Sequence, residues 1–254
     1  MLEVLNLSKL FTGIPAIDSV SFCAPPGAVT GYLGPNGSGK STTVKLITGL
    51  LDPSSGAILW QGSDIRRDPD AFKSILGYVP EEPFLYPQLS GAEYLELAGQ
   101  LRLIPPTRLY SKIEAFLRQF DLYGDRFTPI ASYSKGMRQK ILLAAALLHD
   151  PELVILDEPF SGLDVHSSLV LRHLIQSLAA AGKTVLFSSH ELETVERVCS
   201  RVVILYQGKV VAHDSVENLR SLMALPSLEA IFTQLALRSD PQLTADSLMG
   251  VIQS

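Results

Sequence analysis

The chain has 254 residues, of which 46% are hydrophobic and 19% are charged, a composition typical of a globular protein with ample material for a core. Its formal net charge of -5 lacks the basic excess of nucleic-acid-binding proteins, so we expect no nucleic-acid partner. The segment Met1–Glu3 lacks the basic start and the apolar core of a signal peptide, so we expect none here. The longest apolar run, Ile141–Leu148, is far shorter than the roughly 18 residues of a membrane span. Any membrane role is therefore expected to depend on a partner.

The first part of the chain has the pattern of a small antiparallel sheet. Leu2–Leu7 alternates between apolar and polar residues, which predicts a strand. Ser8–Pro15 is expected to be a turn region that carries Phe11, and Val20–Ala24 is a second strand. Gly56–Trp60, followed by a Gln-Gly turn, predicts a further strand. We interpret these segments as a hairpin-like sheet laid against a parallel one.

A glycine-rich segment fits the pattern G-x-x-x-x-G-K-[ST] and lies between an expected strand, Val29–Leu33, and an expected helix, Thr42–Leu50. Glycines let the backbone turn its N–H groups inward, and a helix N-terminus favours an anion. A chance glycine-rich turn is the alternative, and the strand–helix context argues against it. Lys40 is expected to reach the β- and γ-phosphates of a nucleotide, and the Ser41 hydroxyl to bind Mg²⁺. The expected nucleotide-binding residues here are Gly34, Pro35, Asn36, Gly37, Ser38, Gly39, Lys40, Ser41 and Thr42.

The middle of the chain changes to a helical pattern. Several prolines exclude a helix from Glu81–Pro87. Ser90–Glu93 and Ser111–Glu114 each match a capping box, which predicts a helix start at both places. A third helix is expected over Lys135–Leu148. Residues from about 88 to 150 are therefore predicted to form a helical insertion between two strands.

On either side of this insertion, strands alternate with helices, which predicts a mostly parallel sheet covered by helices. The expected strands are Ile75–Val79, Leu153–Leu156, Thr184–Phe187, Val202–Leu205 and Val210–Val211, with helices near 171–178 and over 191–198. The expected domain covers residues 1–220. Residues 221–254 form a tail whose Leu228, Ile231, Phe232 and Leu235 have helical spacing.

Two carboxylates follow the buried strand Leu153–Leu156, at the edge of a parallel sheet where ligands bind. Asp157 is expected to hold Mg²⁺ through water, and Glu158 to orient or deprotonate an attacking water. Such a pair on its own is more often structural, but the phosphate loop favours catalysis. His190 ends the next strand at the same edge. It either reaches the γ-phosphate or simply caps the following helix.

Further motifs resemble those of ABC-type ATPases. Tyr133–Gln139 resembles the LSGGQ signature and precedes the strand that ends in the two carboxylates. Ser161–Asp164 matches the D-loop of this family, and His190 matches its switch histidine. Phe11 falls where the family has an adenine-stacking aromatic, although a core phenylalanine is the alternative. The resemblance runs from about Leu2 to Val216. It implies an α/β fold: a P-loop NTPase core with a mostly parallel sheet, a small antiparallel β subdomain and an inserted α-helical signature subdomain.

The resemblance also implies an ATPase with ATP and Mg²⁺ as cofactors. It implies catalytic roles for Lys40, Glu158 and His190, and a head-to-tail dimer with itself or with a homologous ATPase subunit. Each ATP would then lie between one subunit's phosphate loop and the other's signature. The residues that contact nucleotide from the opposite subunit would be Ser134, Lys135, Gly136 and Asp164. The implied membrane partner is an integral-membrane permease on a separate chain, which places this chain at the cytoplasmic face of the membrane.

The chain departs from the family pattern at three positions, where Glu81 replaces glutamine, Lys135 replaces glycine and Met137 replaces glutamine. These variants look like those in ATPases of bacterial drug, antibiotic and ion exporters. Glu81 is expected to ligate Mg²⁺ or to be screened by Lys135 of the opposite subunit. The alternative is a solvated loop residue. The loop Glu81–Pro87, beside the helical insertion, is expected to seat the permease.

The expected function is therefore the ATPase subunit of a transporter, most simply an exporter. An importer ATPase is one alternative, and a soluble ABC protein of translation or DNA repair is another. Soluble members typically carry two cassettes or a long coiled-coil insertion, whereas this chain has one cassette and a compact insertion. A P-loop kinase would lack the signature and the switch histidine. The transported substrate is not readable from this chain, because it binds the permease.

Overall fold

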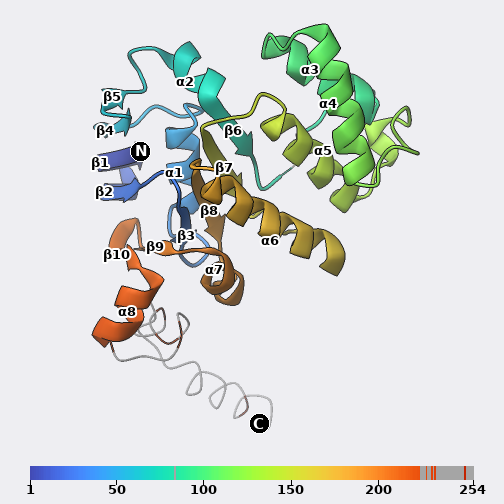
Figure 1. Ribbon diagram of the computed structural model, residues 1–254. Helices are drawn as coiled ribbons and strands as arrows, with labels where there is room; N and C mark the ends of the chain where they lie inside the picture. The colour runs from blue at the N-terminus through green and yellow to red at the C-terminus, as the bar shows by residue number, and fades with distance from the viewer. Residues whose placement is uncertain (83, 224–226, 228–229, 231, 233–248, 250–254) are drawn as a thin grey trace.

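The computed structural model of the chain describes residues 1–82, 84–223, 227, 230, 232 and 249, and Figure 1 shows its two sheets with their covering helices. The strands are β1 (Leu2–Phe11), β2 (Ile14–Ala24), β3 (Val29–Leu33), β4 (Ser55–Trp60), β5 (Ser63–Asp64), β6 (Leu76–Val79), β7 (Leu153–Asp157), β8 (Thr184–Ser189), β9 (Arg201–Tyr206) and β10 (Lys209–Ser215). The helices are α1 (Lys40–Ile47), α2 (Pro69–Ile75), α3 (Gly91–Leu101), α4 (Pro106–Gln119), the 3-10 helix η1 (Ile130–Ser132), α5 (Lys135–Leu147), α6 (Val165–Ala180), α7 (Leu192–Val198) and α8 (Val216–Met223).

The smaller sheet is antiparallel, with strand order β2-β1-β4-β5. It confirms the predicted antiparallel subdomain, but the turn region expected over Ser8–Pro15 is wrong. β1 continues to Phe11, pairs it with Ile14, and turns in only two residues. Those residues, Thr12 and Gly13, both have positive φ, at 48° and 86°. This is the backbone that a tight two-residue hairpin requires, and a pattern of alternating residues does not reveal it.

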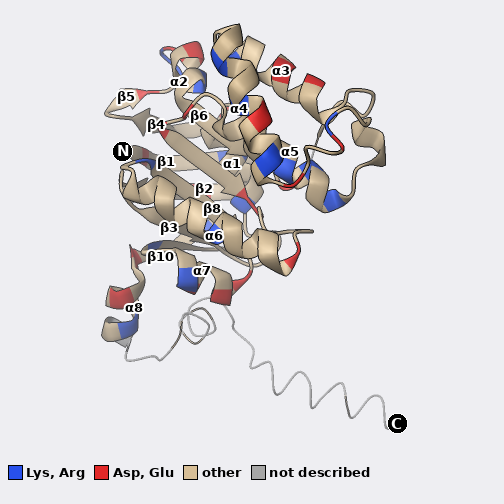
Figure 2. Cartoon of the chain, turned by 45° about the vertical axis from the view of Figure 1, so that its right-hand side comes forward, with Lys and Arg blue, Asp and Glu red and all other residues tan. Residues whose placement is uncertain are grey.

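The larger sheet has the order β10-β9-β3-β8-β7-β6, and all its pairs are parallel except β9 with β10. Alternate residues of its strands face opposite cores, as the period of a strand requires. Leu153 and Ile155 of β7 pack with α1 and the antiparallel sheet. Val154 and Leu156 pack on the other side with α5 and α6. Figure 2 shows α6 crossing this second face of the sheet.

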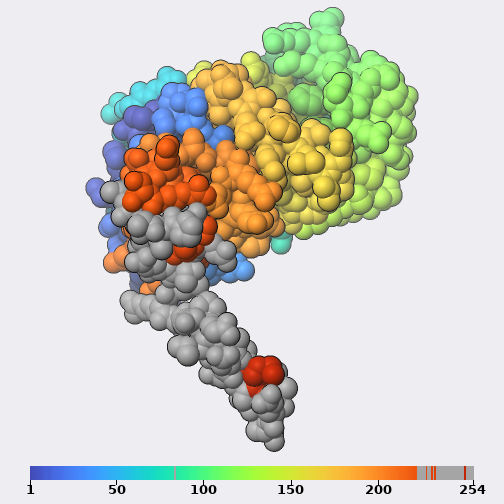
Figure 3. Space-filling model, turned by 60° about the horizontal axis from the view of Figure 1, so that its bottom comes forward, coloured from blue at the N-terminus to red at the C-terminus, as the bar shows by residue number. Residues whose placement is uncertain are grey.

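The insertion between β6 and β7 forms a helical lobe with a core of its own. Leu95 of α3, Leu109 of α4 and Ile141 of α5 are buried together in it. Ser90 caps α3 in the predicted capping box, because its hydroxyl accepts from the Glu93 N–H while the Glu93 carboxylate accepts from the Ser90 N–H. Figure 3 shows the lobe, in green, as a bulge beside the rest of the molecule.

The second predicted capping box is wrong. Ser111 lies inside α4, where its hydroxyl donates to the carbonyl of Arg108 at 3.0 Å. The helix begins one and a half turns earlier at Pro106, after Pro105. Proline suits the first position of a helix because its missing N–H has no partner there. The Ser-x-x-Glu pattern at Ser111–Glu114 therefore occurs by chance inside the helix and does not mark its start.

The end of the described chain returns to the core. α8 crosses the domain boundary expected at residue 220, and Val216 and Leu219 from it are buried against α7 and the large sheet. Phe232 packs against the same cluster. The predicted tail residues Leu228, Ile231 and Leu235 lie outside the described residues. Within the described chain, no helix combines the length and apolarity needed to cross a membrane.

Candidate nucleotide site

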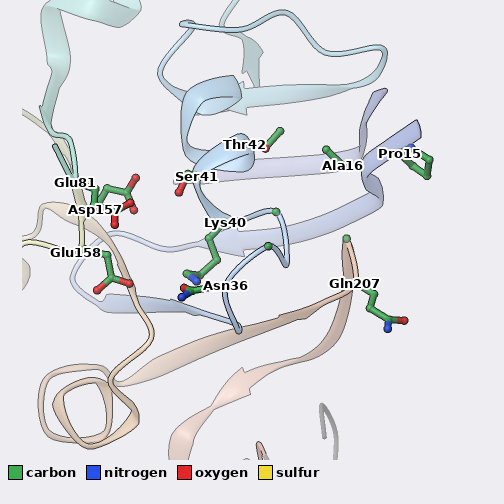
Figure 4. A pocket seen from close by; sticks show the side chains of 13 residues that line it. Pro15, Ala16, Asn36, Lys40, Ser41, Thr42, Glu81, Asp157, Glu158 and Gln207 are labelled. Atoms are coloured by element: carbon green, nitrogen blue, oxygen red, sulfur yellow. The ribbon is translucent and has the colours of Figure 1, made fainter. Parts of the chain in front are cut away.

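A cavity of about 400 Å³ lies at the carboxyl ends of the central strands. The phosphate loop and the first turn of α1 form one wall, and the ends of β6 and β7 form another. The hairpins β1–β2 and β9–β10 supply the remaining side. Figure 4 shows Glu81, Asp157 and Glu158 facing Lys40 and Ser41 across the cavity. The lining residues are Pro15, Ala16, Asn36, Gly37, Gly39, Lys40, Ser41, Thr42, Glu81, Asp157, Glu158, Gln207 and Gly208.

The phosphate loop is wedged so tightly that two of its positions exclude any side chain. A Cβ at Gly34 would lie 2.4 Å from the carbonyl oxygen of Leu205, and one at Gly39 would lie 2.5 Å from the Ile17 side chain. Gly39 also has a φ of 106°, which L side chains rarely adopt. Below the loop, Tyr32 donates to the Thr43 hydroxyl, which donates to the Gly39 carbonyl, both at 3.0 Å. The loop is therefore fixed in shape before any nucleotide binds.

Lys40 lies folded back on this loop. Its Nζ donates to the carbonyls of Gly34 at 2.7 Å and Pro35 at 3.3 Å. Burial lowers the pKa of Lys40, while the charges of Glu158, Asp157 and Glu81 act in the opposite direction. The ammonium is thus held by neutral carbonyls rather than by a paired carboxylate. Among the described residues, Lys40 forms no ion pair, so its ammonium is available to an anionic ligand that enters the cavity.

Asp157 is the buried carboxylate of the site, with 3% of its surface exposed. Its Oδ1 accepts from the Ser188 hydroxyl on the neighbouring strand. Burial raises the pKa of Asp157, and the nearby Glu81 and Glu158 raise it further, against the opposing effects of Ser188 and Lys40. Crowding of carboxylates at one end of a cavity costs free energy that a bound cation relieves.

The donor set suits Mg²⁺ bound together with a nucleotide. Ser41, Asp157 and Glu81 line the same cavity and offer only oxygen donors. Among the described residues, no three His, Cys, Asp or Glu side chains converge closely enough to hold a metal by themselves. Mg²⁺ usually needs only one or two carboxylates, with water and phosphate oxygens completing its octahedron. The site therefore fits a metal that arrives with a triphosphate.

Glu158 is held by both of its carboxylate oxygens. His190 Nδ1 lies 2.8 Å from Oε1, and the Ser189 hydroxyl donates to Oε2 at 3.4 Å. The Glu158 backbone has a φ of 47°, and its N–H donates to the Ser188 carbonyl. A left-handed conformation is uncommon for glutamate and aims the side chain away from the course of β7. The result is a fixed carboxylate at the cavity wall beside an exposed histidine.

The structure brings part of the predicted site together. Gly34, Pro35 and Ser38 belong to the phosphate loop but do not line the cavity, and His190 adjoins it through its contact with Glu158. The residues expected to act from the opposite subunit do not line the cavity, and neither does Phe11. Phe11 ends β1, is 45% exposed, and has the Lys9 ammonium 5.3 Å from its ring centre. It is thus not a core residue. Ser134, Lys135 and Gly136 begin α5, and Asp164 caps α6 by accepting from the Ser167 N–H.

Some residues of the site escaped sequence reasoning. Pro15 and Ala16 line the cavity opposite the carboxylates, as does Gln207 of the β9–β10 turn. Ser188 and Ser189 hold the two carboxylates. One feature of the sequence could have indicated Ser188 and Ser189: they directly precede His190 at the end of a strand. Hydroxyls at that position lie at the same edge of the sheet as the carboxylates of the neighbouring strand β7.

A phosphate loop and two carboxylates that line one cavity, together with a helical lobe inserted between β6 and β7, are the features of an ATPase of the ABC class. The sequence pattern of the family described as "ABC transporter" matches residues 17–161. The chain is 36% identical over 220 residues to the ABC-type transporter ATP-binding protein EcsA of Bacillus subtilis, covering 87% of this chain and 89% of the relative. It is 35% identical over 212 residues to the linearmycin resistance ATP-binding protein LnrL of the same organism, covering 84% and 68%.

A solved structure of an ATP-binding subunit of an ABC transporter superposes with a TM-score of 0.87 at 35% identity, covering 92% of this chain and 99% of that one. The chain belongs to the ABC transporter ATP-binding family. It is an ATP-binding subunit of a membrane transporter and an ATPase, which confirms the predicted family, fold and enzyme class.

Proposed function

We propose that the chain hydrolyses Mg²⁺-ATP as one half of a head-to-tail dimer, and that this dimer powers an exporter from the cytoplasmic face of the membrane. The observation that carries the proposal is the separation of two half-sites. Lys40 and Glu158 share the cavity, whereas the signature residues Ser134–Gly136 of the same subunit do not line it. The signature opens α5, whose N-terminal N–H groups suit an anion. A second subunit can supply them to the open cavity.

Within one half-site, each polar residue has a distinct task. Lys40 moves from the loop carbonyls to the β- and γ-phosphates, and Glu158 takes a proton from the attacking water. Ser41, Asp157 and Glu81 hold Mg²⁺, which screens the phosphate charge. His190 keeps Glu158 oriented through Nδ1 and has its other ring nitrogen free for the γ-phosphate.

The surface expected to receive the permease is aromatic. Phe84, Tyr86 and Phe127 are 79%, 55% and 73% exposed. Their segments are neighbours, because the Ala131 N–H donates to the Pro87 carbonyl at 2.9 Å. Exposed aromatic side chains gathered in this way suit a partner surface better than they suit water. This supports docking of the permease on the loop after Glu81 and the adjoining lobe.

Export rather than import is supported by two observations. One relative is named for linearmycin resistance, and resistance to an antibiotic is a task of outward transport. The Glu81, Lys135 and Met137 variants also resemble exporter ATPases. Inverted membrane vesicles that contain the chain and its permease test the direction with labelled amphiphilic antibiotics. ATP-dependent uptake into these vesicles is expected, and uptake only into right-side-out vesicles would make the complex an importer.

The dimer is tested with Glu158→Gln, because an amide still accepts and donates hydrogen bonds but cannot take a proton at neutral pH. We expect this variant to bind ATP with ordinary affinity, to lose most turnover, and to sediment as a dimer only when ATP is present. Adding Ser134→Arg to the same chain should abolish that dimer by placing a long cation at the start of α5. Hydrolysis at the normal rate by Glu158→Gln would remove this residue from the role of base.

A further inference from the structure

The start of α5 packs directly on the turn that follows Glu158 in the same subunit. A Cβ at Gly136 would lie 2.8 Å from the Gly162 carbonyl oxygen, so the two backbones are in close contact. One turn further along α5, the buried Gln139 donates from Nε2 to the Pro159 carbonyl at 3.2 Å. The signature helix and the segment Pro159–Gly162 therefore form a single packed unit.

Lys135 completes this unit. Its Nζ donates to the Ser161 hydroxyl at 2.7 Å. Its aliphatic stem covers Gly162, where a Cβ would lie 2.7 Å from Lys135 Cδ. Gly162 has a φ of 79°, so this close approach and its backbone conformation both favour glycine. The side chain thus lies along its own subunit, although Lys135 remains exposed to solvent.

The turn held by Lys135 begins at Glu158. The Ser161 N–H donates to the Glu158 carbonyl at 3.1 Å, so a shift of Ser161 moves the Glu158 backbone directly. Glu158 has the left-handed φ of 47° that aims its carboxylate at the cavity. Such a conformation persists only where the surroundings enforce it. Within the described chain, the Lys135 ammonium forms no ion pair that would compete with its contact to Ser161.

We propose that Lys135 is a positioning residue for Glu158 of its own subunit, acting through Ser161, and that it is not a contact to the nucleotide of the opposite subunit. This inference rests on the proposed role of Glu158 as base. It assigns a task to the residue that replaces glycine in the signature. In the proposed dimer it would also couple two features of one subunit. These are the position of the signature, which faces the phosphate loop of the opposite subunit, and the orientation of Glu158 in the subunit's own half-site.

The test is a double-mutant cycle on ATP hydrolysis by the full chain with its permease. Lys135→Ala and Ser161→Ala should each lower kcat by about three- to tenfold, the loss expected when one hydrogen bond that holds a catalytic turn is removed. KM for ATP should stay within about twofold, because Glu158 acts after binding. The double variant should be no slower than the slower single variant, and Lys135→Arg should retain most of the rate.

Lys140 provides the matched control, because it is a second lysine on α5 that does not bond to Ser161. The effects of Lys140→Ala and Ser161→Ala should multiply in the combined variant, as they do for independent sites. The proposal would be overturned if the reductions in kcat of Lys135→Ala and Ser161→Ala multiplied in the double variant. It would also be overturned if neither single variant changed kcat. A raised KM in Lys135→Ala alone, which would indicate a contact to nucleotide, would overturn it as well. Normal hydrolysis by Glu158→Gln, run in parallel, would instead overturn the underlying proposed function.

Discussion

At the scale of one residue, Lys40 is held close to the cavity by contacts within its own loop. Its ammonium is buried and bonded to two loop carbonyls, and burial lowers its pKa although three carboxylates lie nearby. Neutral carbonyls hold a cation more weakly than phosphate oxygens do. In the proposed function, the side chain would therefore exchange these carbonyls for phosphate oxygens when nucleotide binds.

Lys40→Ala is expected to abolish tight ATP binding, because the charge-assisted contacts to the β- and γ-phosphates are lost. The loop itself should survive, since the Tyr32–Thr43–Gly39 hydrogen bonds do not involve Lys40. Isothermal calorimetry with Mg²⁺-ATP measures the affinity, and circular dichroism checks the fold. Ordinary affinity in a well-folded variant would contradict the assignment of the loop.

A local pattern can name site residues that lie in one contiguous segment. Six cavity-lining residues of the predicted segment Gly34–Thr42 could be named in this way, Asn36, Gly37, Gly39, Lys40, Ser41 and Thr42. Ser188 and Gln207 could not, since their roles depend on which strands become neighbours in the sheet. Ser188 faces Asp157 only because β8 pairs with β7 in that register. Such pairing is decided by packing across the whole sheet, which no local pattern records.

At the scale of elements, the joint between β6 and α5 is unusually close. A Cβ at Gly77 would lie 2.4 Å from the Ala146 carbonyl oxygen and 2.8 Å from the Pro151 ring. Gly77→Ala should therefore push α5 away from the sheet edge and lower the free energy of unfolding by about 1–3 kcal/mol, the usual cost of overpacking. Urea denaturation followed by circular dichroism measures this change.

Gly124→Ala is the matched control for this prediction. Gly124 lies in the helical lobe, and a Cβ there would meet no atom within 4 Å. Its φ does not require glycine either. Equal unfolding midpoints for Gly77→Ala and Gly124→Ala would show that β6 and α5 can separate without cost.

The sequence predicted elements that have strong hydrophobic periodicity. It did not predict the ends of β1 and α4, or the short helix α2. The central strands of the large sheet are nearly continuous apolar runs, and their burial on both faces follows directly. The extension of β1 to Phe11 depends on two positive φ values, and the start of α4 depends on a Pro-Pro pair. The short α2, with one buried residue, Phe72, has too little apolar surface to signal a helix.

At the scale of the whole molecule, the helical lobe and the core are joined by side-chain nitrogens that contact backbone carbonyls. Arg102 of the lobe donates to the carbonyls of Lys73 and Leu76 beside α2. His149, in the link between α5 and β7, lies with Nε2 3.1 Å from the same Leu76 carbonyl. Burial, together with the charges of Arg102 and Lys112, lowers the pKa of His149 to about 4, against the opposing effects of the hydrogen bond to the Leu76 carbonyl and of Asp150.

This joint should weaken in acid. His149 titrates near its ordinary value of about 6.5 in the unfolded chain and near 4 in the folded one. The unfolded state therefore binds more protons between these values, so the stability contribution is complete above pH 6.5 and is lost as the pH falls toward 4. The midpoint of urea unfolding should fall more steeply between pH 7 and 5 in the wild type than in His149→Gln. Parallel slopes would mean that His149 titrates normally in the folded protein.

The central position of β3 has a consequence for synthesis on the ribosome. β3 lies between β8 and β9, so the strand that leads into the phosphate loop pairs only with segments that begin at Thr184 and Arg201. The loop residues leave the ribosome early, yet their strand has no sheet neighbour until about three quarters of the chain has been made. Pairings that close such long loops form late. We therefore expect a nascent chain that ends before Thr184 to lack the sheet that supports the phosphate loop, and nucleotide binding to appear only in longer chains.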